Sequence, residues 1–354
     1  MSARCSQARI PRSARLAGGV ASRRQQQGVA LLVAILLVAL GTIIAAAMAY
    51  NNAMTARRAA ATFSFDQALL VSEGAEAIAA YGLQQTLKQN PSDIDPTQVW
   101  NQPLGPVEAI PGVMLEAHLE DLQGRFNIND LVGTDGETPN TAAIAAFQRL
   151  LAMLNMNAKW ADFMVDWIDK DATSMIPDGA EDSVYMETDP PYRTPNLPIT
   201  STSELLALPG FTRADFDRLA PYIVALPLGT AINTCTASPY VLDALTGHQQ
   251  FSADPQQFVK DRQAAGGCFP TMQDVLTAAG NVQGANQNLQ GTGQNPQVPG
   301  QSNQTITSII GQKSVWFRLT TFLTLGSTQF SVYTVLYESP SGTARPVMRS
   351  FTPD

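Results

Sequence analysis

Carboxylate side chains crowd one segment of the chain, from residue 162 to residue 189, where the only basic partner is Lys170. The nine acids are Asp162, Asp166, Asp169, Asp171, Asp178, Glu181, Asp182, Glu187 and Asp189. Carboxylates gathered in this way repel one another, and a hard cation such as calcium, which takes six to eight oxygen ligands, would relieve that repulsion. The spacing is not that of an EF-hand loop. The alternative interpretation is a solvated acidic loop that binds no metal.

Catalytic chemistry has little support in the sequence. Paired carboxylates can act as acid and base in a glycosidase, but no apolar pocket with aromatic platforms can be recognised near the acids. The two histidines are also poorly placed, since His118 falls in an alternating strand pattern and His248 in a polar loop. No G-x-S-x-G motif is present, and no CxxC pair suggests zinc. We therefore predict that the chain is not an enzyme.

An apolar helix near the N-terminus is expected to anchor the rest of the chain at a membrane. Residues 29–49 carry no charge, and 21 residues of helix span about 31 Å, enough to cross a bilayer. Six arginines precede the run, whereas only Arg57 and Arg58 follow it closely, which predicts a cytoplasmic N-terminus. A cleaved secretory signal and a plain signal anchor are the alternatives.

The helical pattern continues through residues 51–87, with an apolar stripe at Phe63, Leu70, Val71, Ile78 and Tyr81. We expect a Pro-rich loop at 90–111 and a hairpin at 113–127, because residues 113–121 alternate apolar and polar and the chain turns at Gly124. Helix faces then begin near Thr141, and capping boxes start at Ser201, Thr212 and Thr271. A Gly/Gln/Asn-rich linker precedes three further strands at 316–325, 329–338 and 344–351.

These patterns predict an α+β fold, in which a long N-terminal helix packs on an antiparallel sheet and a large helical block is inserted into the sheet domain. The segment 205–222, with Leu-Pro-Gly-Phe between two expected helices, has the outline of a helix-hairpin-helix or SAM-like element. Such elements can bind DNA, so a membrane-anchored DNA receptor is a rival function. The charge argues against it, because the chain carries −8 overall and this hairpin has no basic surplus.

Several motifs together resemble the minor pseudopilin K (GspK) family of the type II secretion system. The stretch 121–130, DLQGRFNIND, and the acidic run 166–192, with D-W-I-D-K-D, G-A-E-D-S-V-Y and P-P-Y, carry the resemblance. The junction Arg-Arg-Gln-Gln-Gln-Gly before the apolar run resembles a prepilin leader. By resemblance, the leader would be cut after Gly28, and Val29 would become the N-methylated mature N-terminus. Val33 would occupy the place where most pseudopilins carry a glutamate and K members do not.

The resemblance implies a pilin-like fold with a spine helix, and a structural calcium site for which Asp169, Asp171, Glu181 and Asp182 are the expected ligands. It also implies a subunit at the tip of the pseudopilus that helps to initiate and cap the filament, which pushes folded exoproteins through the outer-membrane secretin. Expected partners are the I and J minor pseudopilins, the major pseudopilin and the prepilin peptidase, with no nucleic acid. The protein would sit in the bacterial inner membrane, with its C-terminal domain in the periplasm.

The expected domains are a leader at 1–28, a membrane-spanning helix at 29–49, a first pilin-like part at 50–130, a helical insertion at 131–279, a linker at 280–304 and final strands at 305–354. Loss of the six leader arginines would change the net charge from −8 to −14. A minor pilin of a type IV pilus is the nearest alternative, because the leader alone does not distinguish the two.

Two cysteines remain beyond the leader, which contains Cys5. An even number in an oxidising compartment predicts a disulfide between Cys235 and Cys268. Two buried free thiols are the alternative.

Overall fold

The computed structural model describes residues 22–247, 251–268, 309–339 and 341–353, with side chains from Val29 onward. Helix α1 (Ser22–Gln89) opens the described chain, and a boundary between two compact units falls within it, between Phe65 and Asp66. The predicted linker at 280–304 and the predicted cap at Thr271 lie outside the described residues.

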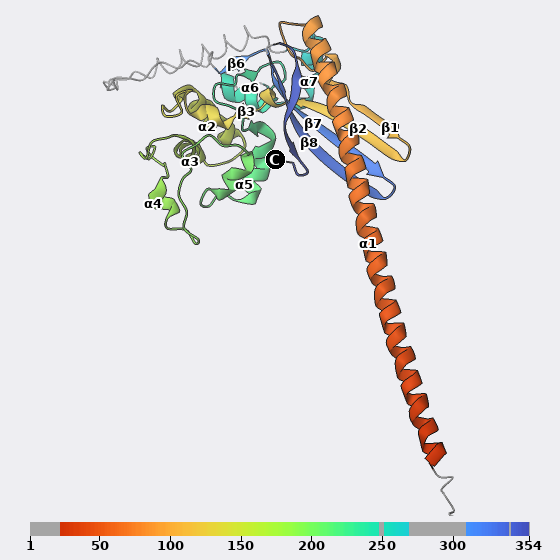
Figure 1. The fold of residues 1–354 in the computed structure, drawn as a ribbon. Helices are drawn as coiled ribbons and strands as arrows, with labels where there is room; N and C mark the ends of the chain where they lie inside the picture. Colours follow the sequence, from red (N-terminus) through yellow and green to blue (C-terminus); the bar gives the residue numbers. More distant parts are fainter. Residues whose placement is uncertain (1–21, 248–250, 269–308, 340, 354) are drawn as a thin grey trace, which may run out of the picture. The chain divides into compact units, whose positions relative to one another are not determined.

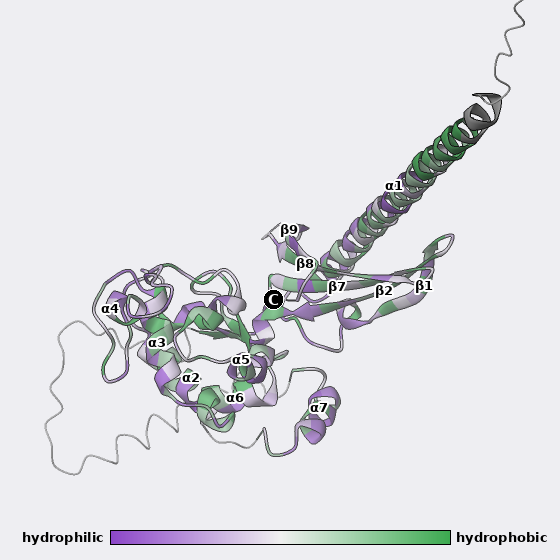
Figure 2. Cartoon of the chain, turned by 90° about the horizontal axis from the view of Figure 1, so that it is seen from below, coloured by the Kyte–Doolittle hydropathy of each residue, from purple (hydrophilic) through white to green (hydrophobic). Residues whose placement is uncertain are grey.

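The first unit is the apolar part of α1. Figure 2 shows this part coloured as hydrophobic over several consecutive turns. Among the described helices it is the one that is long and apolar enough to cross a membrane by length and composition. Its side chains, including Val29 and Val33, are exposed within the unit. One long apolar N-terminal helix therefore fits a single-pass membrane anchor.

The second unit contains an antiparallel sheet of five strands in the order β1-β2-β7-β8-β9. Figure 1 labels β1, β2, β7 and β8 of this sheet. The strands are β1 (Leu104–Ile110), β2 (Val113–Asp121), β7 (Trp316–Leu325), β8 (Thr328–Glu338) and β9 (Ala344–Ser350). Strand β2 alternates buried and exposed residues because its odd-numbered side chains face α1. The final three strands are confirmed, and Gly326 makes the β7–β8 turn with a positive φ of 59°.

The loop expected at 90–111 is wrong in its second half, because residues 104–110 form strand β1, paired with β2. This edge strand is mostly exposed, so its sequence lacks the alternation that marks a half-buried strand. Upstream of β1, the short 3-10 helix η1 (Val99–Asn101) buries Trp100 against Phe317 of the sheet.

The contact between α1 and the sheet uses small side chains rather than the predicted stripe. Ala68, Ala75 and Ala79 are buried there together with Leu83. Of the five stripe residues, Val71 packs partly against this core, whereas Leu70, Ile78 and Tyr81 are 57–67% exposed. Small residues let the helix approach the sheet closely, and the larger apolar side chains are left on its outer face.

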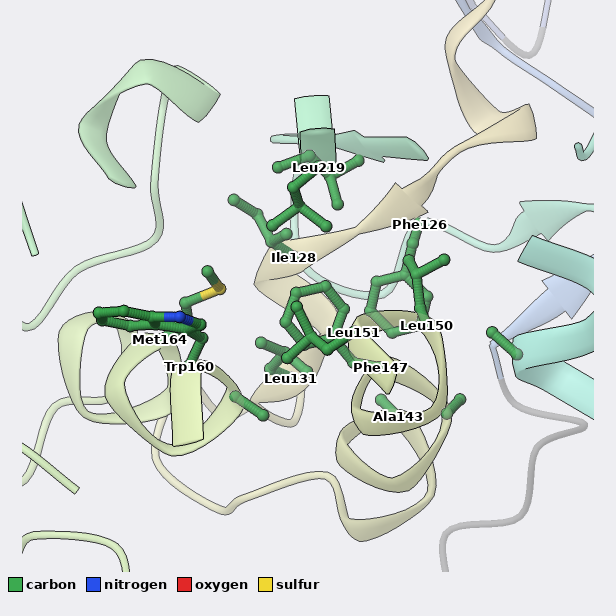
Figure 3. Packing of buried hydrophobic residues seen from close by; sticks show 14 of the residues in the cluster. Phe126, Ile128, Leu131, Ala143, Phe147, Leu150, Leu151, Trp160, Met164 and Leu219 are labelled. Atoms are coloured by element: carbon green, nitrogen blue, oxygen red, sulfur yellow. The ribbon is translucent and has the colours of Figure 1, made fainter. Parts of the chain in front are cut away.

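Between β2 and β7 the chain forms a helical block with its own core (Figure 3). Its elements are η2 (Leu122–Gly124), β3 (Phe126–Asn127), η3 (Ile128–Leu131), α2 (Thr141–Met153), α3 (Lys159–Ile168), α4 (Asp182–Tyr185), η4 (Thr202–Ala207), α5 (Arg213–Leu219), η5 (Ala220–Tyr222), β4 (Ile223–Val224), β5 (Ile232–Asn233), α6 (Pro239–Thr246), α7 (Pro255–Ala264) and β6 (Ile310–Gly311). The predicted capping boxes at Ser201 and Thr212 are both formed.

Phe126 and Ile128 lie fully buried in this helical core, beside Phe147 and Leu150 of α2 (Figure 3). The hairpin predicted for 113–127 is therefore wrong: β2 pairs with β1 before it and with β7 after it. Residues 122–131 leave the sheet and become the first layer of the inserted block, because Phe126, Ile128 and Leu131 are taken up by its core.

A buried carboxylate joins the block to the sheet. Asp121, the last residue of β2, accepts hydrogen bonds from Ser314 Oγ (2.6 Å) and Asn233 Nδ2 (3.0 Å), and from the hydroxyl of Thr236. Asn233 Nδ2 also donates to the carbonyl of Ile94, just beyond the end of α1. The two chain crossings between sheet and block are thus held side by side, beyond the C-terminal end of the helix.

Candidate metal centre

Helix α3 and its C-cap residue present three acids to the loop that follows. Asp162, Asp166 and Asp169 recur at spacings of four and three residues, so they share one face of the helix. All three are less than 5% exposed. Asp169 is also the C-cap of α3, where the backbone turns from helical to extended. Because these three acids are buried on one helix face, they do not form a solvated acidic loop.

Asp166 folds the loop back onto the helix. The Met175 N–H donates to both carboxylate oxygens of Asp166, at 3.0 and 3.1 Å, and Ala180 donates to the same carboxylate. Gly179 passes so close that a Cβ there would lie 2.3 Å from Asp166 Oδ2. This tight return brings Glu181 over the end of α3.

One oxygen each from Asp169, Asp171 and Glu181 lies within 4.8 Å of the others. Asp169 Oδ1 and Glu181 Oε1 are buried and have no hydrogen-bond partner among the described residues. Burial, together with the charges of Asp171, Asp166 and Glu181, raises the pKa of Asp169 to about 7. Burial, together with neighbouring acids, likewise raises the pKa of Glu181 to about 7. Asp171 is better satisfied, because its Oδ1 accepts from the N–H of Thr173 at 2.6 Å. Two buried carboxylate oxygens of the cluster are therefore left without a donor in the described part of the chain.

Asn196 lies beside Asp171 and has an unpaired amide oxygen, which the sequence analysis missed. Its Nδ2 donates to the carbonyl of Asp171 at 2.8 Å, and its Oδ1 is buried without a partner in the described part of the chain. Asn196 has a positive φ of 47°, a conformation that asparagine tolerates better than most residues. No spacing rule connects Asn196 to the acids 25 residues earlier, so only the fold could reveal it.

Asp182 stands outside this cluster, although it was expected to be a ligand. Its Oδ1 accepts from the N–H and the hydroxyl of Thr194, both at 3.1 Å, and its Oδ2 pairs with exposed Arg193 at 3.4 Å. Asp182 is also the first residue of α4, where the backbone becomes helical. Its carboxylate therefore points toward Thr194 rather than toward Asp169 and Asp171. Its role is to hold the returning segment 193–194.

The donor set fits a hard cation. Three carboxylates and one amide oxygen can supply up to seven oxygen contacts, and the set contains no nitrogen or sulfur ligand. The net charge of the three ionised acids, −3, would suit a divalent ion. Asp162 and Asp166 lie behind this set and position its loop.

The remaining predicted site residues lie elsewhere. Cys235 and Cys268 form a disulfide, and Cys268 Sγ also accepts from Gln312 Nε2 at 3.4 Å. Gly28, Val29 and Val33 all lie within α1. The disulfide ties the segment carrying α7 to the turn after β5, next to the carboxylate hub at Asp121.

A family model described as "Type II secretion system (T2SS), protein K" matches residues 124–228. Two curated proteins named type II secretion system protein K are similar over a longer stretch. One, from Pseudomonas aeruginosa, is 34% identical over 244 residues, covering 66% of this chain and 71% of that protein. The other, from Klebsiella pneumoniae, is 32% identical over 252 residues, covering 68% and 77%.

The fold is similar to that of a solved chain from the crystal structure of the GspK–GspI–GspJ complex of the enterotoxigenic Escherichia coli type 2 secretion system. The TM-score is 0.63 at 19% identity, and the alignment covers 84% of this chain and all of that one. The long helix, the antiparallel sheet and the inserted block thus form an arrangement that occurs in a solved relative.

Proposed function

The chain belongs to the type II secretion system protein K family, and we propose that it acts as the minor pseudopilin at the tip of the pseudopilus. It is a minor pseudopilin of the type II secretion system by its relatives. The tip position rests on one observation: the inserted block is hydrogen-bonded to Ile94, directly beyond the C-terminal end of α1. A bulky block at this end would obstruct a further subunit stacking above it, whereas subunits below remain free to add.

The membrane part of this proposal concerns the N-terminus. Cleavage after Gly28 by a prepilin peptidase would leave Val29 as an N-methylated terminus and α1 as the anchor, with the C-terminal unit in the periplasm. Val33 fits a first subunit, because no earlier subunit offers an amine for a glutamate at this place to pair with. Mass spectrometry of the N-terminal peptide tests this: an unmethylated or uncut peptide would contradict it.

We assign the partner-facing surface to the outer face of α1. Leu70, Ile78 and Tyr81 lie there, each more than half exposed, while the opposite face of α1 is occupied by the sheet. Apolar side chains at spacings of eight and three suit packing against other helices. The proposed partners are the spine helices of the I and J minor pseudopilins, with the major pseudopilin below them.

A pull-down tests this surface directly. The full-length chain should retain the I and J proteins, and the pair Leu70→Ser and Ile78→Ser should lose both. The control is Val107→Ser on edge strand β1, which is 42% exposed and lies away from α1's outer face. Retention by the double variant, or equal loss in the control, would argue against the assignment.

We propose that calcium occupies the oxygen cluster, with Asp169, Asp171, Glu181 and Asn196 as its ligands. The ion would supply the positive charge that half-buried Asp171 and buried Asp169 and Glu181 lack, and so hold loop 171–181 to the segment 193–197. It would be structural, in keeping with a chain that we propose has no enzymatic activity.

Calcium titration of the detergent-solubilised chain tests this proposal. Saturating calcium at about 100 times Kd should stabilise the fold by about 2.7 kcal/mol, and Asp169→Asn should abolish the increase in Tm. Asp182→Asn is the matched control, because that acid lies outside the cluster, and it should keep the increase. The same increase with magnesium alone would point to a smaller, octahedral ion instead.

The hairpin around Gly210 is proposed as a scaffold and protein-contact element rather than a DNA site. Its first helix, η4, is a 3-10 helix, and the basic side chains of α5 are engaged. Arg213 pairs with Asp217 at 2.8 Å, and Arg218 donates to the carbonyl of Leu154 at 3.5 Å. A gel shift with duplex DNA should therefore show no salt-sensitive binding.

A further inference from the structure

A cavity of about 250 Å³ lies on the flank of α1, where the helix meets the sheet. The α1 residues that line it are Ala75, Ile78, Ala79 and Gly82. Its other walls come from η1, which contributes Val99 and Trp100, and from residues of β1, β2 and β7. Among the described residues that line the cavity, none is Asp, Glu, Lys or Arg. The cavity therefore suits an uncharged, apolar occupant, since nothing in its walls would compensate a buried charge.

The four α1 residues have the spacing of a hole between packed helices. They stand at positions i, i+3, i+4 and i+7 of one continuous helix, and such residues form a diamond on the helix surface. Where helices pack knobs into holes, a side chain of one helix enters a hole formed by four residues of the other. The spacing therefore indicates the occupant, which is a side chain that projects from a neighbouring helix.

Three of the four side chains are small, so the diamond is hollow. A Cβ added at Gly82 would meet no heavy atom within 4 Å outside its own stretch of helix. Glycine lowers the stability of a helix interior, and the described packing of α1 does not require it at this place. The volume also lies below the roughly 300 Å³ at which pockets for small molecules begin. A side chain thus fits the cavity better than a small ligand.

The cavity is continuous with the surface that we assigned to the partner helices. Ile78 is 57% exposed and belongs both to that surface and to the cavity wall. On the η1 side, Val99 is 60% exposed, whereas Trp100 is buried and packs against Phe317. Gly82 lies only about 40° around the helix axis from Ile78. A helix along the outer face of α1 would therefore bring its side chains over the cavity.

We propose that the cavity receives a large apolar side chain, such as leucine, methionine or phenylalanine, from the spine helix of a neighbouring minor pseudopilin. This inference rests on the proposed function, because it takes the partner helices named there as given. It adds that the contact extends beyond α1 to Val99 and Trp100 of η1. The outer face of α1 provides a broad helix contact, and the cavity sets the register of the two helices, because the projecting side chain has one hole to enter.

Filling the cavity from α1 is the first test. The full-length chain in detergent is titrated with the purified I and J proteins. Gly82→Leu should lower the affinity for at least one of them by about tenfold or more, and Gly82→Ala should have a smaller effect because it leaves most of the cavity open. The Tm of both variants should stay the same or rise, since a Cβ at this position meets no neighbour. Ala80→Leu, about 200° around the helix from Gly82, is the control and should keep the affinity.

The second test leaves α1 unchanged. Val99→Glu places a charge beside the cavity from η1 and should weaken binding of the same protein by about tenfold. Val107→Glu on β1 is the matched control, because Val107 is also an exposed valine but does not line the cavity. A benzoylphenylalanine photo-crosslinker in place of Val99 should react with a residue in the N-terminal helix of the I or J protein, as mapped by mass spectrometry.

The outcomes separate this inference from the proposed function. Unchanged affinity in Gly82→Leu or in Val99→Glu, or a crosslink to a segment outside a helix, would overturn the inference. If the pair Leu70→Ser and Ile78→Ser loses both partners while these variants keep them, the partner-facing surface of α1 stands and the cavity has no role in it. A parent chain that binds neither protein would overturn both.

Discussion

Glu338 should make the chain less stable at high pH, and replacing it with glutamine should reverse this. The residue ends strand β8 with a fully buried side chain, and neither carboxylate oxygen has a hydrogen-bond partner among the described residues. Burial raises the pKa of Glu338 from 4.5 to about 7. This rise corresponds to about 3 kcal/mol in favour of the neutral form.

The sign follows from proton binding. Between pH 4.5 and 7 the folded chain holds the Glu338 proton while the unfolded chain releases it, so stability falls as pH rises through this window. Glutamine stays neutral. The free energy of unfolding of Glu338→Gln relative to the parent should therefore increase by up to about 3 kcal/mol from pH 4.5 to pH 8.

Urea unfolding followed by tryptophan fluorescence measures this, because all four tryptophans lie between residues 100 and 316. Glu120→Gln is the control of opposite sign. Although burial opposes the shift, Arg125 and Arg318 lower the pKa of Glu120, so this variant should lose more stability at pH 8 than at pH 4. A Glu338→Gln effect that stays constant with pH would refute the reasoning.

Three further changes test other parts of the structure. Glu76→Gln should cost about 1–3 kcal/mol in urea unfolding, because it removes the charge that Arg349 meets through two hydrogen bonds. Gly179→Ala should weaken calcium binding about tenfold in a titration, because the new methyl group would displace the returning loop. Replacing Cys235 and Cys268 with serine should cost about 3–4 kcal/mol, as expected for a closed loop of 33 residues, and reduction of the parent chain should match it.

The sequence predicted best where a periodic pattern and burial agree. Strands β7 and β8 and the continuous helix α1 were predicted closely, because their patterns extend over many residues. The sequence was misleading where side chains are exposed, because the hydrophobic pattern there does not indicate which residues pack against the core. Strand β1 is exposed and read as a loop, and the conspicuous apolar residues of α1 turned out to face away from the sheet.

The oxygen cluster shows the same limit at the level of single residues. Asp169, Asp171 and Glu181 could be chosen from the sequence because they are dense in a short segment. Asp182 could not be told apart from Glu181, since neighbouring residues point in different directions only once α4 begins between them. Asn196 joins through a loop return that no local spacing encodes.

The placement of the block between two adjacent strands bears on how the chain folds. Asp121 of β2 pairs with Phe317 of β7, so the central pair of the sheet closes a loop of nearly two hundred residues. In an unfolded chain such closure would cost about 4–5 kcal/mol of entropy. A block that has already folded brings Asp121 and Ser314 within hydrogen-bond reach, and most of that cost then disappears. The block should therefore fold early and bring β2 and β7 together, so that the sheet can nucleate on it. Destabilising the core of the block would then slow the folding of the distant strands as well.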